Sequence, residues 1–341
     1  MAAPFSRKNE TPMEIGQMSY IILMAGVIIL ALCVLKYRQN VEASKAILEK
    51  SGTKIALLSG SHQIIIMFLF LGYIILFYYE NQGVKTAASF FVVVIFFFGT
   101  ISAIMAILLQ GDMLLSVKSR QEEVEKINQQ LTATERVTIF ALAYQAELRD
   151  LETGKHLERT SRYVELLAER LASSPKYRSY LTPAYIADLV KSAPLHDIGK
   201  VAIPDSILRK PGRLTPEEFE IIKKHCEYGM KVLKIADEKL TFQSFLRIAI
   251  QMVGSHHERW DGKGYPAGLK SDTIPLSGRI MALADVYDAL RSQRCYKKAI
   301  LHEEACRIIT GERATQFDPD IIDAFCEIEK KFHEISVTFI D

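Results

Sequence analysis

The sequence predicts an all-α protein in three parts: a region with three membrane-spanning helices, a helical linker and an all-helical domain. Three apolar runs lie within the first 110 of the 341 residues. Beyond residue 137, apolar side chains recur at helical spacing, and the sequence shows no alternating strand pattern of any length. We therefore expect a transmembrane region at 1–110, a linker at 111–137 and a helical domain at 138–341.

Each apolar run in the first third is bounded by charged residues. We expect spanning helices over about 18–36, 62–80 and 87–109, because a spanning helix needs about 20 apolar residues. The first two runs reach that length only if flanking residues such as Lys36 extend to the membrane interface. A buried core helix is the alternative for one such run, but three in succession favour spanning helices.

The basic residues between the runs predict the orientation. The segment between the first and second runs carries Lys36, Arg38, Lys45, Lys50 and Lys54. The segment between the second and third runs offers only Lys85. The positive-inside rule therefore places the first loop and the C-terminal region in the cytoplasm and the N-terminus outside. Arg7 and Lys8 weakly oppose this orientation.

Charge and cysteine usage narrow the class of protein. The chain has 42 basic and 40 acidic residues, so charge gives no reason to expect nucleic-acid binding. None of the five cysteines forms a CxxC pair, and four lie in the predicted cytoplasmic part, where thiols stay reduced. The sequence has no GxxxxGK(S/T) or GxGxxG motif, so a P-loop or a Rossmann turn is not supported.

Residues 111–150 predict one long charged helix. An incomplete heptad seam runs along it, made by Leu114, Val117, Val124, Ile127 and Leu131. Because the seam spans barely three repeats, two alternatives remain open. In one alternative, the segment 111–135 pairs with the same segment of a second copy and forms a homodimer. In the other, the helix lies on the domain that follows it.

Helix caps recur in the domain after the linker. Thr182-Pro183 supplies an N-cap followed by a proline at the first helical position. The segment Thr215-Pro216-Glu217-Glu218 repeats this device and adds a capping box. The segment 275–293 is also helix-like. A helical domain of roughly 200 residues is large enough for its own core.

Histidines and carboxylates gather at a few places in this domain. The candidate metal ligands are Glu152, His156, His196, Asp197, His225, His256, His257 and Asp285. Glu152 and His156 are four residues apart, so on a helix they share one face. Imidazoles and carboxylates without thiolates suit iron, manganese, nickel or zinc better than calcium or magnesium. Two such ions about 3.5–4 Å apart would clamp the oxygens of a phosphoryl displacement, with Asp197 as the natural bridge.

Other titratable residues receive a plainer interpretation. Asp288 is expected to support a ligand or the structure instead of binding a metal directly. His62, His302 and His333 are expected to be ordinary surface or core residues.

The run His256 to Pro266, with the sequence HHERWDGKGYP, and the doublet His196-Asp197 resemble the HD-GYP family of the HD phosphohydrolases. The resemblance covers roughly residues 140–330. Further motifs match in the same order, namely ETGKH at 152–156, LHDIGK at 195–200, ADVYDAL at 284–290 and FDP at 317–319. Two departures are visible, since Cys295 replaces the usual proline and Lys263 a small polar residue.

The resemblance implies a metal-dependent phosphodiesterase that hydrolyses cyclic di-GMP to pGpG, with GMP as the product of a second cut. It implies two or three divalent ions, iron in the first place and manganese or nickel as alternatives, held by the eight candidate ligands. Asp197 and Lys200 would be catalytic. The residues expected to bind the substrate are Lys200, Tyr265, Arg294 and Lys297.

The apolar runs imply a membrane setting, and the resemblance implies partners. We expect a multi-pass protein of the bacterial inner membrane with a cytoplasmic catalytic domain, in contact with the lipid bilayer and with diguanylate cyclases. Two alternatives stay open. In the first, the domain hydrolyses another cyclic dinucleotide, since the sequence does not separate guanine from adenine. In the second, it is an inactive signalling scaffold.

Overall fold

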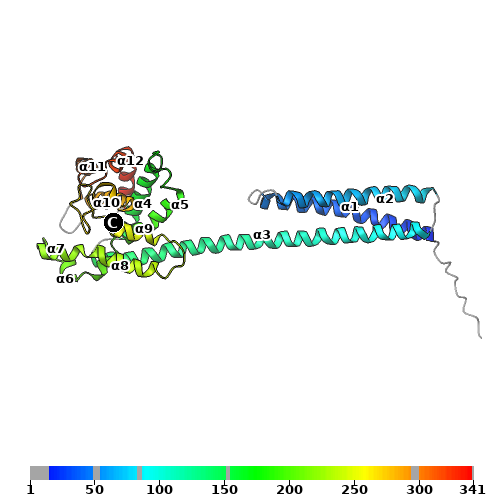
Figure 1. The fold of residues 1–341 in the computed structure, drawn as a ribbon, viewed down its shortest axis with the longest axis horizontal. Helices are drawn as coiled ribbons and strands as arrows, with labels where there is room; N and C mark the ends of the chain where they lie inside the picture. Colours follow the sequence, from blue (N-terminus) through cyan, green and yellow to red (C-terminus); the bar gives the residue numbers. More distant parts are fainter. Residues whose placement is uncertain (1–14, 49–53, 83–86, 151–153, 293–298, 340–341) are drawn as a thin grey trace, which may run out of the picture. The chain divides into compact units, whose positions relative to one another are not determined.

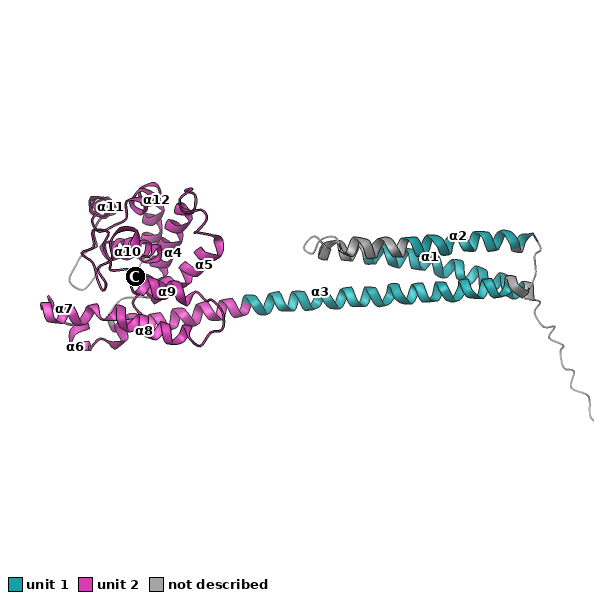
Figure 2. Cartoon of the chain, in the orientation of Figure 1, with its two compact units in different colours: residues 1–129 teal, residues 130–341 magenta. Residues whose placement is uncertain are grey.

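The computed structural model describes residues 15–48, 54–82, 87–150, 154–292 and 299–339 (Figure 1). These residues form helices joined by turns, and no strand occurs among them beyond an isolated bridge between Arg313 and Phe317. The predicted all-α fold class is confirmed. The chain divides into two compact units, residues 1–129 and 130–341 (Figure 2).

The first unit is built from three helices. They are α1 (Ile15–Leu48), α2 (Lys54–Asn81) and the first part of α3 (Ala87–Asp150). Buried side chains from all three pack together, namely Leu23, Leu30, Leu69, Tyr73 and Val93. Tyr73 also shares a buried hydrogen bond of 2.9 Å with the Thr100 hydroxyl. A Cβ atom on Gly26 would lie 2.0 Å from the Tyr73 hydroxyl, so this glycine permits the close approach of α1 to α2.

Two helices in the described residues are long and apolar enough to cross a membrane. These spans lie within Gln17–Asn40 and Phe90–Arg149, and the apolar helical stretch Ile64–Tyr79 is shorter. Length and apolar composition are the only basis for naming these spans, and a buried core helix or a signal sequence has the same length and composition. The expectation of three membrane spans therefore stays a prediction.

The second unit contains the end of α3 and a series of shorter helices. They are α4 (Gly154–Ala172), α5 (Pro183–Ser192), η1 (Ala193–Leu195), η2 (Ile198–Ala202), α6 (Asp205–Leu208), α7 (Pro216–Lys223), α8 (His225–Asp237), α9 (Leu246–Val253), η3 (Ser271–Thr273), α10 (Leu276–Arg291), α11 (His302–Gly311) and α12 (Pro319–Thr338).

Local sequence signals explain where several of these helices begin. The Thr182 hydroxyl accepts a hydrogen bond from the Tyr185 N–H at the start of α5. At the start of α7, Thr215 and Glu218 form the expected reciprocal capping box. Helix α10 fills the segment expected at 275–293. These predictions are confirmed.

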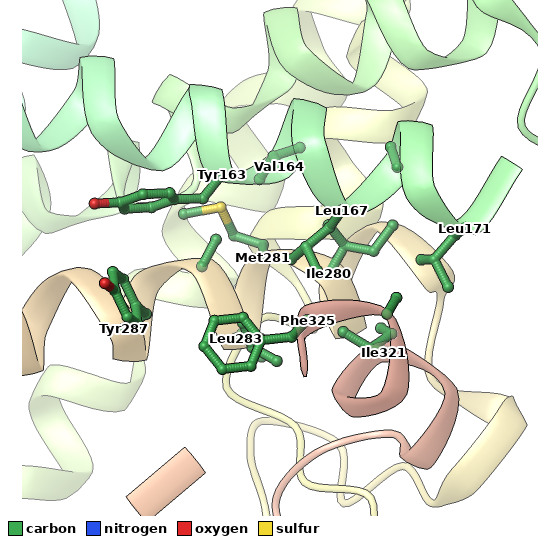
Figure 3. Packing of buried hydrophobic residues seen from close by; sticks show 14 of the residues in the cluster. Tyr163, Val164, Leu167, Leu171, Ile280, Met281, Leu283, Tyr287, Ile321 and Phe325 are labelled. Atoms are coloured by element: carbon green, nitrogen blue, oxygen red, sulfur yellow. The ribbon is translucent and has the colours of Figure 1, made fainter. Parts of the chain in front are cut away.

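Two buried clusters hold the second unit together. In the larger one, Tyr163 of α4 stacks on Phe332 of α12 at 4.4 Å and meets Tyr287 of α10 edge-on at 5.2 Å. Figure 3 shows the same layer with Leu167, Met281 and Phe325 filling the space between the three helices. Each fully buried side chain of this size contributes about 1.5–3 kcal/mol.

The smaller cluster anchors the end of α3 against helices that carry candidate ligands. Its buried members are Ile139, Ala143, Leu157, Leu195, Leu233, Ala249 and Val253. Because these residues belong to α3, α4, η1, α8 and α9, their packing fixes the elements around the candidate site.

Candidate metal centre

Five candidate ligands from separate segments converge inside the second unit. His156 comes from α4, His196 and Asp197 follow η1, His225 begins α8, and His256 follows α9. All five side chains are buried, with at most 5% of each residue exposed. Neighbouring imidazole rings lie 5.3–5.6 Å apart between their centroids. The fold therefore brings residues between His156 and His256 of the sequence together in one cluster.

The two oxygens of Asp197 face different sets of nitrogens. Oδ1 lies 3.1 Å from His225 Nε2 and 3.6 Å from His256 Nε2. Oδ2 lies 3.2 Å from His196 Nε2 and 2.7 Å from Lys200 Nζ. Two ligands bound to one ion at about 2.0–2.2 Å are themselves roughly 3.0–3.5 Å apart. Asp197 therefore has the geometry of a bridge between two cation positions.

Local hydrogen bonds set the orientation of three imidazoles. The Nδ1 atoms of His196, His225 and His256 lie 3.0, 2.8 and 3.1 Å from the carbonyl oxygen of the residue three positions earlier. A carbonyl oxygen only accepts, so each Nδ1 donates a proton to it and each Nε2 points into the cluster. Metal-binding histidines are held in this way.

The buried Nε2 atoms fit the presence of a cation. Nε2 of His196 and of His256 has no hydrogen bond of normal geometry with any described residue. Burying a polar atom without a partner costs about 1–3 kcal/mol, which a bound cation would remove. These residues therefore fit the metal that their chemistry implies.

Electrostatics favour the ligand forms of Asp197, His256 and His257. Burial raises the pKa of the Asp197 carboxyl, but the positive charges of Lys200 and His196 outweigh it and hold the pKa well below its usual range. Burial lowers the pKa of His256, and it lowers that of His257 further. Burial also lowers the pKa of His225, but the Asp197 carboxylate overcomes this and raises it to about 10. A cation binding His225 would therefore displace a proton.

One close backbone contact brings Asp197 and His225 together. A Cβ atom on Gly199 would lie 1.9 Å from the His225 carbonyl oxygen and 2.6 Å from the Gly229 nitrogen. Glycine at this position therefore lets η2 lie directly against the first turn of α8. Asp197 is the residue that immediately precedes η2, so its position depends on this contact.

Glu147 joins the cluster and was missed by the sequence analysis. Its carboxylate and the rings of His156 and His196 each offer a ligand atom, and these atoms lie within 4.8 Å of one another. Glu147 is 1% exposed and lies four residues after the buried Ala143 of α3. The sequence did contain one signal for Glu147, namely a carboxylate on the apolar face of a predicted helix. The expected ligand Glu152 lies outside the described residues.

Two aspartates of α10 take different positions. Asp285 Oδ1 lies 3.8 Å from His156 Nε2, at the inner edge of the cluster. Asp288 accepts a hydrogen bond of 2.8 Å from His156 Nδ1 and is paired with Arg159 at 2.7 and 3.0 Å. Asp288 thus orients His156, as expected of a supporting residue, and turns the ring's Nε2 toward the cluster.

The loop after His257 is fixed by a buried carboxylate. Glu258 is 3% exposed and accepts hydrogen bonds from the N–H groups of Ala267 and Leu269 at 2.8 and 3.0 Å. Gly264 permits the loop to fold back, because a Cβ atom there would lie 2.4 Å from the Arg259 nitrogen. This packing holds the following Tyr265 in place.

Tyr265 forms a small aromatic group beside the cluster. Its ring lies 4.7 Å from the ring of His257 and meets Phe219 of α7 edge-on at 6.1 Å. The Lys223 ammonium lies 5.5 Å from the Tyr265 centroid and 4.9 Å from the Phe219 centroid. Sequence analysis named Tyr265 but missed Phe219 and Lys223, since only the folded chain brings α7 to this loop. Arg294 and Lys297 lie outside the described residues.

Comparison with known proteins identifies relatives of this second unit. A family model described as "HD domain" matches residues 144–321. A Vibrio cholerae protein named "Cyclic di-GMP phosphodiesterase" is 51% identical over 234 residues, covering 69% of this chain and 46% of that protein. A second Vibrio cholerae protein, "Probable cyclic di-GMP phosphodiesterase", is 50% identical over 67% of this chain and 53% of its own length.

A third Vibrio cholerae relative carries a different substrate in its name. The protein named "3'3'-cGAMP-specific phosphodiesterase 2" is 39% identical over 62% of this chain and 38% of its own length. The chain thus spans about half the length, or less, of these curated relatives.

Proposed function

The chain belongs to the HD domain family, and from this premise we propose that it is a metal-dependent phosphodiesterase that hydrolyses cyclic di-GMP to pGpG. The observation that carries the proposal is the geometry of Asp197, whose Oδ1 lies 3.1 and 3.6 Å from Nε2 of His225 and His256 and whose Oδ2 lies 3.2 Å from Nε2 of His196. Two relatives that are at least half identical over the matched region are named "Cyclic di-GMP phosphodiesterase" and "Probable cyclic di-GMP phosphodiesterase".

Two groups of residues would hold the ions. Asp197, His225, His256 and His257 form one group, and Glu147, His156 and His196 form the other. When bound, divalent ions supply Lewis acidity that stabilises charge on the phosphoryl oxygens. The nitrogen and carboxylate donors suit iron, with manganese or nickel as alternatives. We propose two ions, with a third if Glu152 or Asp285 contributes.

Lys200 is the side chain we assign to the reacting phosphate. Its ammonium lies 2.7 Å from Asp197 Oδ2 and the side chain keeps 12% of its surface exposed, so it can reach a ligand from this position. Hydrolysis adds a water oxygen to phosphorus and breaks the bond to the 3′-oxygen, which must gain a proton. We assign to Lys200 the orientation of the phosphate and assistance to this proton transfer. Arg294 and Lys297 are proposed to bind phosphates on the strength of the resemblance.

The aromatic group beside His257 is proposed to bind a base. Phe219 is 44% exposed and stands next to Tyr265, so a purine can stack on its ring. Stacking does not distinguish guanine from adenine. A mixed cyclic dinucleotide is therefore the second candidate substrate. The relative named for 3′3′-cGAMP supports this candidate.

The first unit is proposed to anchor the enzyme in the bacterial inner membrane, with the catalytic unit in the cytoplasm. Ile28, Met67 and Phe91, one on each helix, are 59–68% exposed, which suits contact with lipid. The seam residues Val124 and Leu131 are also exposed, at 56% and 65%, which suits a homodimer through 111–135. A diguanylate cyclase partner is proposed from the resemblance.

The decisive experiment measures turnover and metal content on the same anaerobic sample of the full-length protein. We expect hydrolysis of cyclic di-GMP to pGpG, faster than that of 3′3′-cGAMP, and two or three equivalents of bound metal. Asp197→Ala should abolish turnover, whereas Asp323→Ala on the exposed surface of α12 should leave it unchanged. Bound metal with no hydrolysis of either dinucleotide would identify a scaffold and refute the proposed activity.

A further inference from the structure

The last turn of α3 carries an arginine that the proposed hydrolysis leaves without a role. Arg149 reaches from this turn to the segment that follows Lys200. Its Nη1 group donates a hydrogen bond to the Val201 carbonyl, and its Nη2 group donates one of 3.1 Å to the Ile203 carbonyl. Nε and Nη2 also donate to Asp205 Oδ1 at 3.2 and 2.7 Å. One side chain of α3 therefore holds three residues of this short segment.

The carbonyls that Arg149 binds lie at the end of a short helix. η2 spans Ile198–Ala202, so Val201 lies in its last turn and Ile203 is its C-cap. The last carbonyls of a helix have no partner inside that helix. A 3₁₀ helix also has poor hydrogen-bond geometry and is stable only over short runs. The planar guanidinium, whose donors lie in a fixed fork, therefore fastens a segment that its own hydrogen bonds hold weakly.

Lys200 is the residue whose position depends on this fastening. Its N–H donates to the Asp197 carbonyl at 2.9 Å, and its carbonyl accepts from the Ile203 N–H at 3.0 Å. The preceding Gly199 packs against α8 so closely that a Cβ atom there would lie 1.9 Å from a backbone oxygen. The backbone of Lys200 is therefore held by α8 through the residue before it and by α3 through the residue after it. The ammonium of this fixed residue lies 2.7 Å from Asp197 Oδ2.

The contacts of Arg149 suit a role in positioning more than a role in stability. The Arg149 side chain is 33% exposed, and that of Asp205 is 61% exposed. Ion pairs between side chains exposed to this extent contribute little to folding. Neither residue belongs to the two buried clusters of the unit. Removal of the guanidinium should therefore free the segment that carries Lys200 and leave the unit folded.

We propose that Arg149 is a positioning residue that holds Lys200 against the reacting phosphate, an inference that rests on the proposed function. Hydrolysis joins a water oxygen to phosphorus, breaks the bond from phosphorus to the 3′-oxygen and leaves that oxygen to gain a proton. Lys200 assists this proton transfer only while its ammonium stays near the 3′-oxygen. A shift of about 1 Å in such a group costs about 100-fold in rate. Arg149 prevents this shift from a distance, through the backbone of Val201.

Two phosphodiesters with different leaving groups test the proposal. The leaving ribose oxygen of cyclic di-GMP needs a proton, whereas nitrophenolate leaves bis(p-nitrophenyl) phosphate as a stable anion. In the full-length, metal-loaded protein, we expect Arg149→Ala to lose about 100-fold in kcat on cyclic di-GMP, with bound metal unchanged. On bis(p-nitrophenyl) phosphate the loss should be at least about tenfold smaller, since general acid assistance is worth about 100-fold or more. A purely structural defect would lower both rates and the metal content together.

Further variants separate the geometry of the guanidinium from its charge. Arg149→Lys keeps the positive charge beside Asp205, but a single ammonium does not reproduce the fork, so the loss on cyclic di-GMP should persist. Added guanidinium ion should restore part of the rate of Arg149→Ala. Arg170→Ala is the matched control, because the Arg170 side chain is equally exposed, at 33%, and pairs with Glu327 on α12. Both rates should stay unchanged in this control.

Two results would overturn the role of Arg149. One is a parental kcat on cyclic di-GMP in Arg149→Ala, and the other is an equal loss on both substrates. Hydrogen exchange reads the same contact without turnover, and we expect the amides of 198–205 to exchange faster in Arg149→Ala than in the parent protein and in Arg170→Ala. If the parent protein cleaves no dinucleotide, the proposed function fails, and unchanged exchange over 198–205 would refute the positioning separately.

Discussion

Gly199→Ala is the sharpest test of how the fold builds the metal centre. The new Cβ atom would lie 1.9 Å from the His225 carbonyl oxygen and 2.6 Å from the Gly229 nitrogen. Both neighbours are backbone atoms, so no side-chain rotation relieves the contact. The substitution therefore forces η2 away from the first turn of α8.

The distance by which η2 and α8 must separate sets the expected loss of stability and of catalytic rate. To restore a contact of about 3.0 Å, the two backbones must separate by roughly 1 Å. Asp197 Oδ1 now lies 3.1 Å from His225 Nε2, and the same shift moves them to about 4 Å, beyond the separation of two ligands on one ion. Overpacking costs about 1–3 kcal/mol of stability, and a 1 Å misplacement in a catalytic site costs about 100-fold in rate.

The assay compares turnover of cyclic di-GMP, bound metal and the unfolding midpoint for Gly199→Ala and for Gly311→Ala. A Cβ atom on Gly311 meets nothing within 4 Å, so that variant controls for the substitution itself. We expect Gly199→Ala to lose about 100-fold in kcat and part of its metal, with the unit still folded. Full turnover and full metal content in Gly199→Ala would refute the link between the backbone contact and the position of Asp197.

Three further substitutions test separate parts of the site. Asp288→Asn removes the carboxylate charge that pairs with the buried Arg159 and His156 Nδ1, and breaking a buried ion pair costs about 3–5 kcal/mol, which lowers the unfolding midpoint by about 10 °C in circular dichroism. Glu147→Gln removes a buried anionic ligand and should weaken binding of one ion by about 10–100-fold, measured by elemental analysis at limiting metal. Phe219→Ala removes a stacking surface worth about 1–3 kcal/mol, so KM for the dinucleotide should rise about 5–100-fold at nearly constant kcat.

Glu147→Gln has a matched control, and each of the three substitutions has an outcome that would contradict it. Glu135→Gln removes another α3 carboxylate, which pairs with Lys191 instead of the centre, and should keep the full metal content. Equal metal content in Glu135→Gln and Glu147→Gln would remove Glu147 from the ligand set. An unchanged KM in Phe219→Ala would place the base elsewhere, and an unchanged midpoint in Asp288→Asn would show that Arg159 finds another partner.

Local chemistry explains which features the sequence could predict. The caps at Thr182 and Thr215 act within three or four residues, so a single stretch of sequence contains both partners. The doublets His196-Asp197 and His256-His257 were informative because imidazole and carboxylate side chains, the groups that bind such metals, are concentrated in few positions. These predictions needed no knowledge of tertiary structure.

The features that sequence missed depend on contacts between distant segments. Glu147 and His156 belong to different helices, and their approach follows from the packing of α3 on α4. Phe219 meets Tyr265 only because the loop after α9 folds back onto α7.

The orientation of the imidazoles divides the centre into two kinds of ligand. His196, His225 and His256 take their orientation from carbonyls of their own short segments, so the direction of each ring depends only on its own turn. His156 takes its orientation from Asp288, which lies 132 positions further along the chain on α10. A slight loosening of α4 against α10 would therefore release this ligand first and leave the others in place. Within one cluster, three ring orientations thus depend on local backbone, and one depends on the packing of α4 against α10.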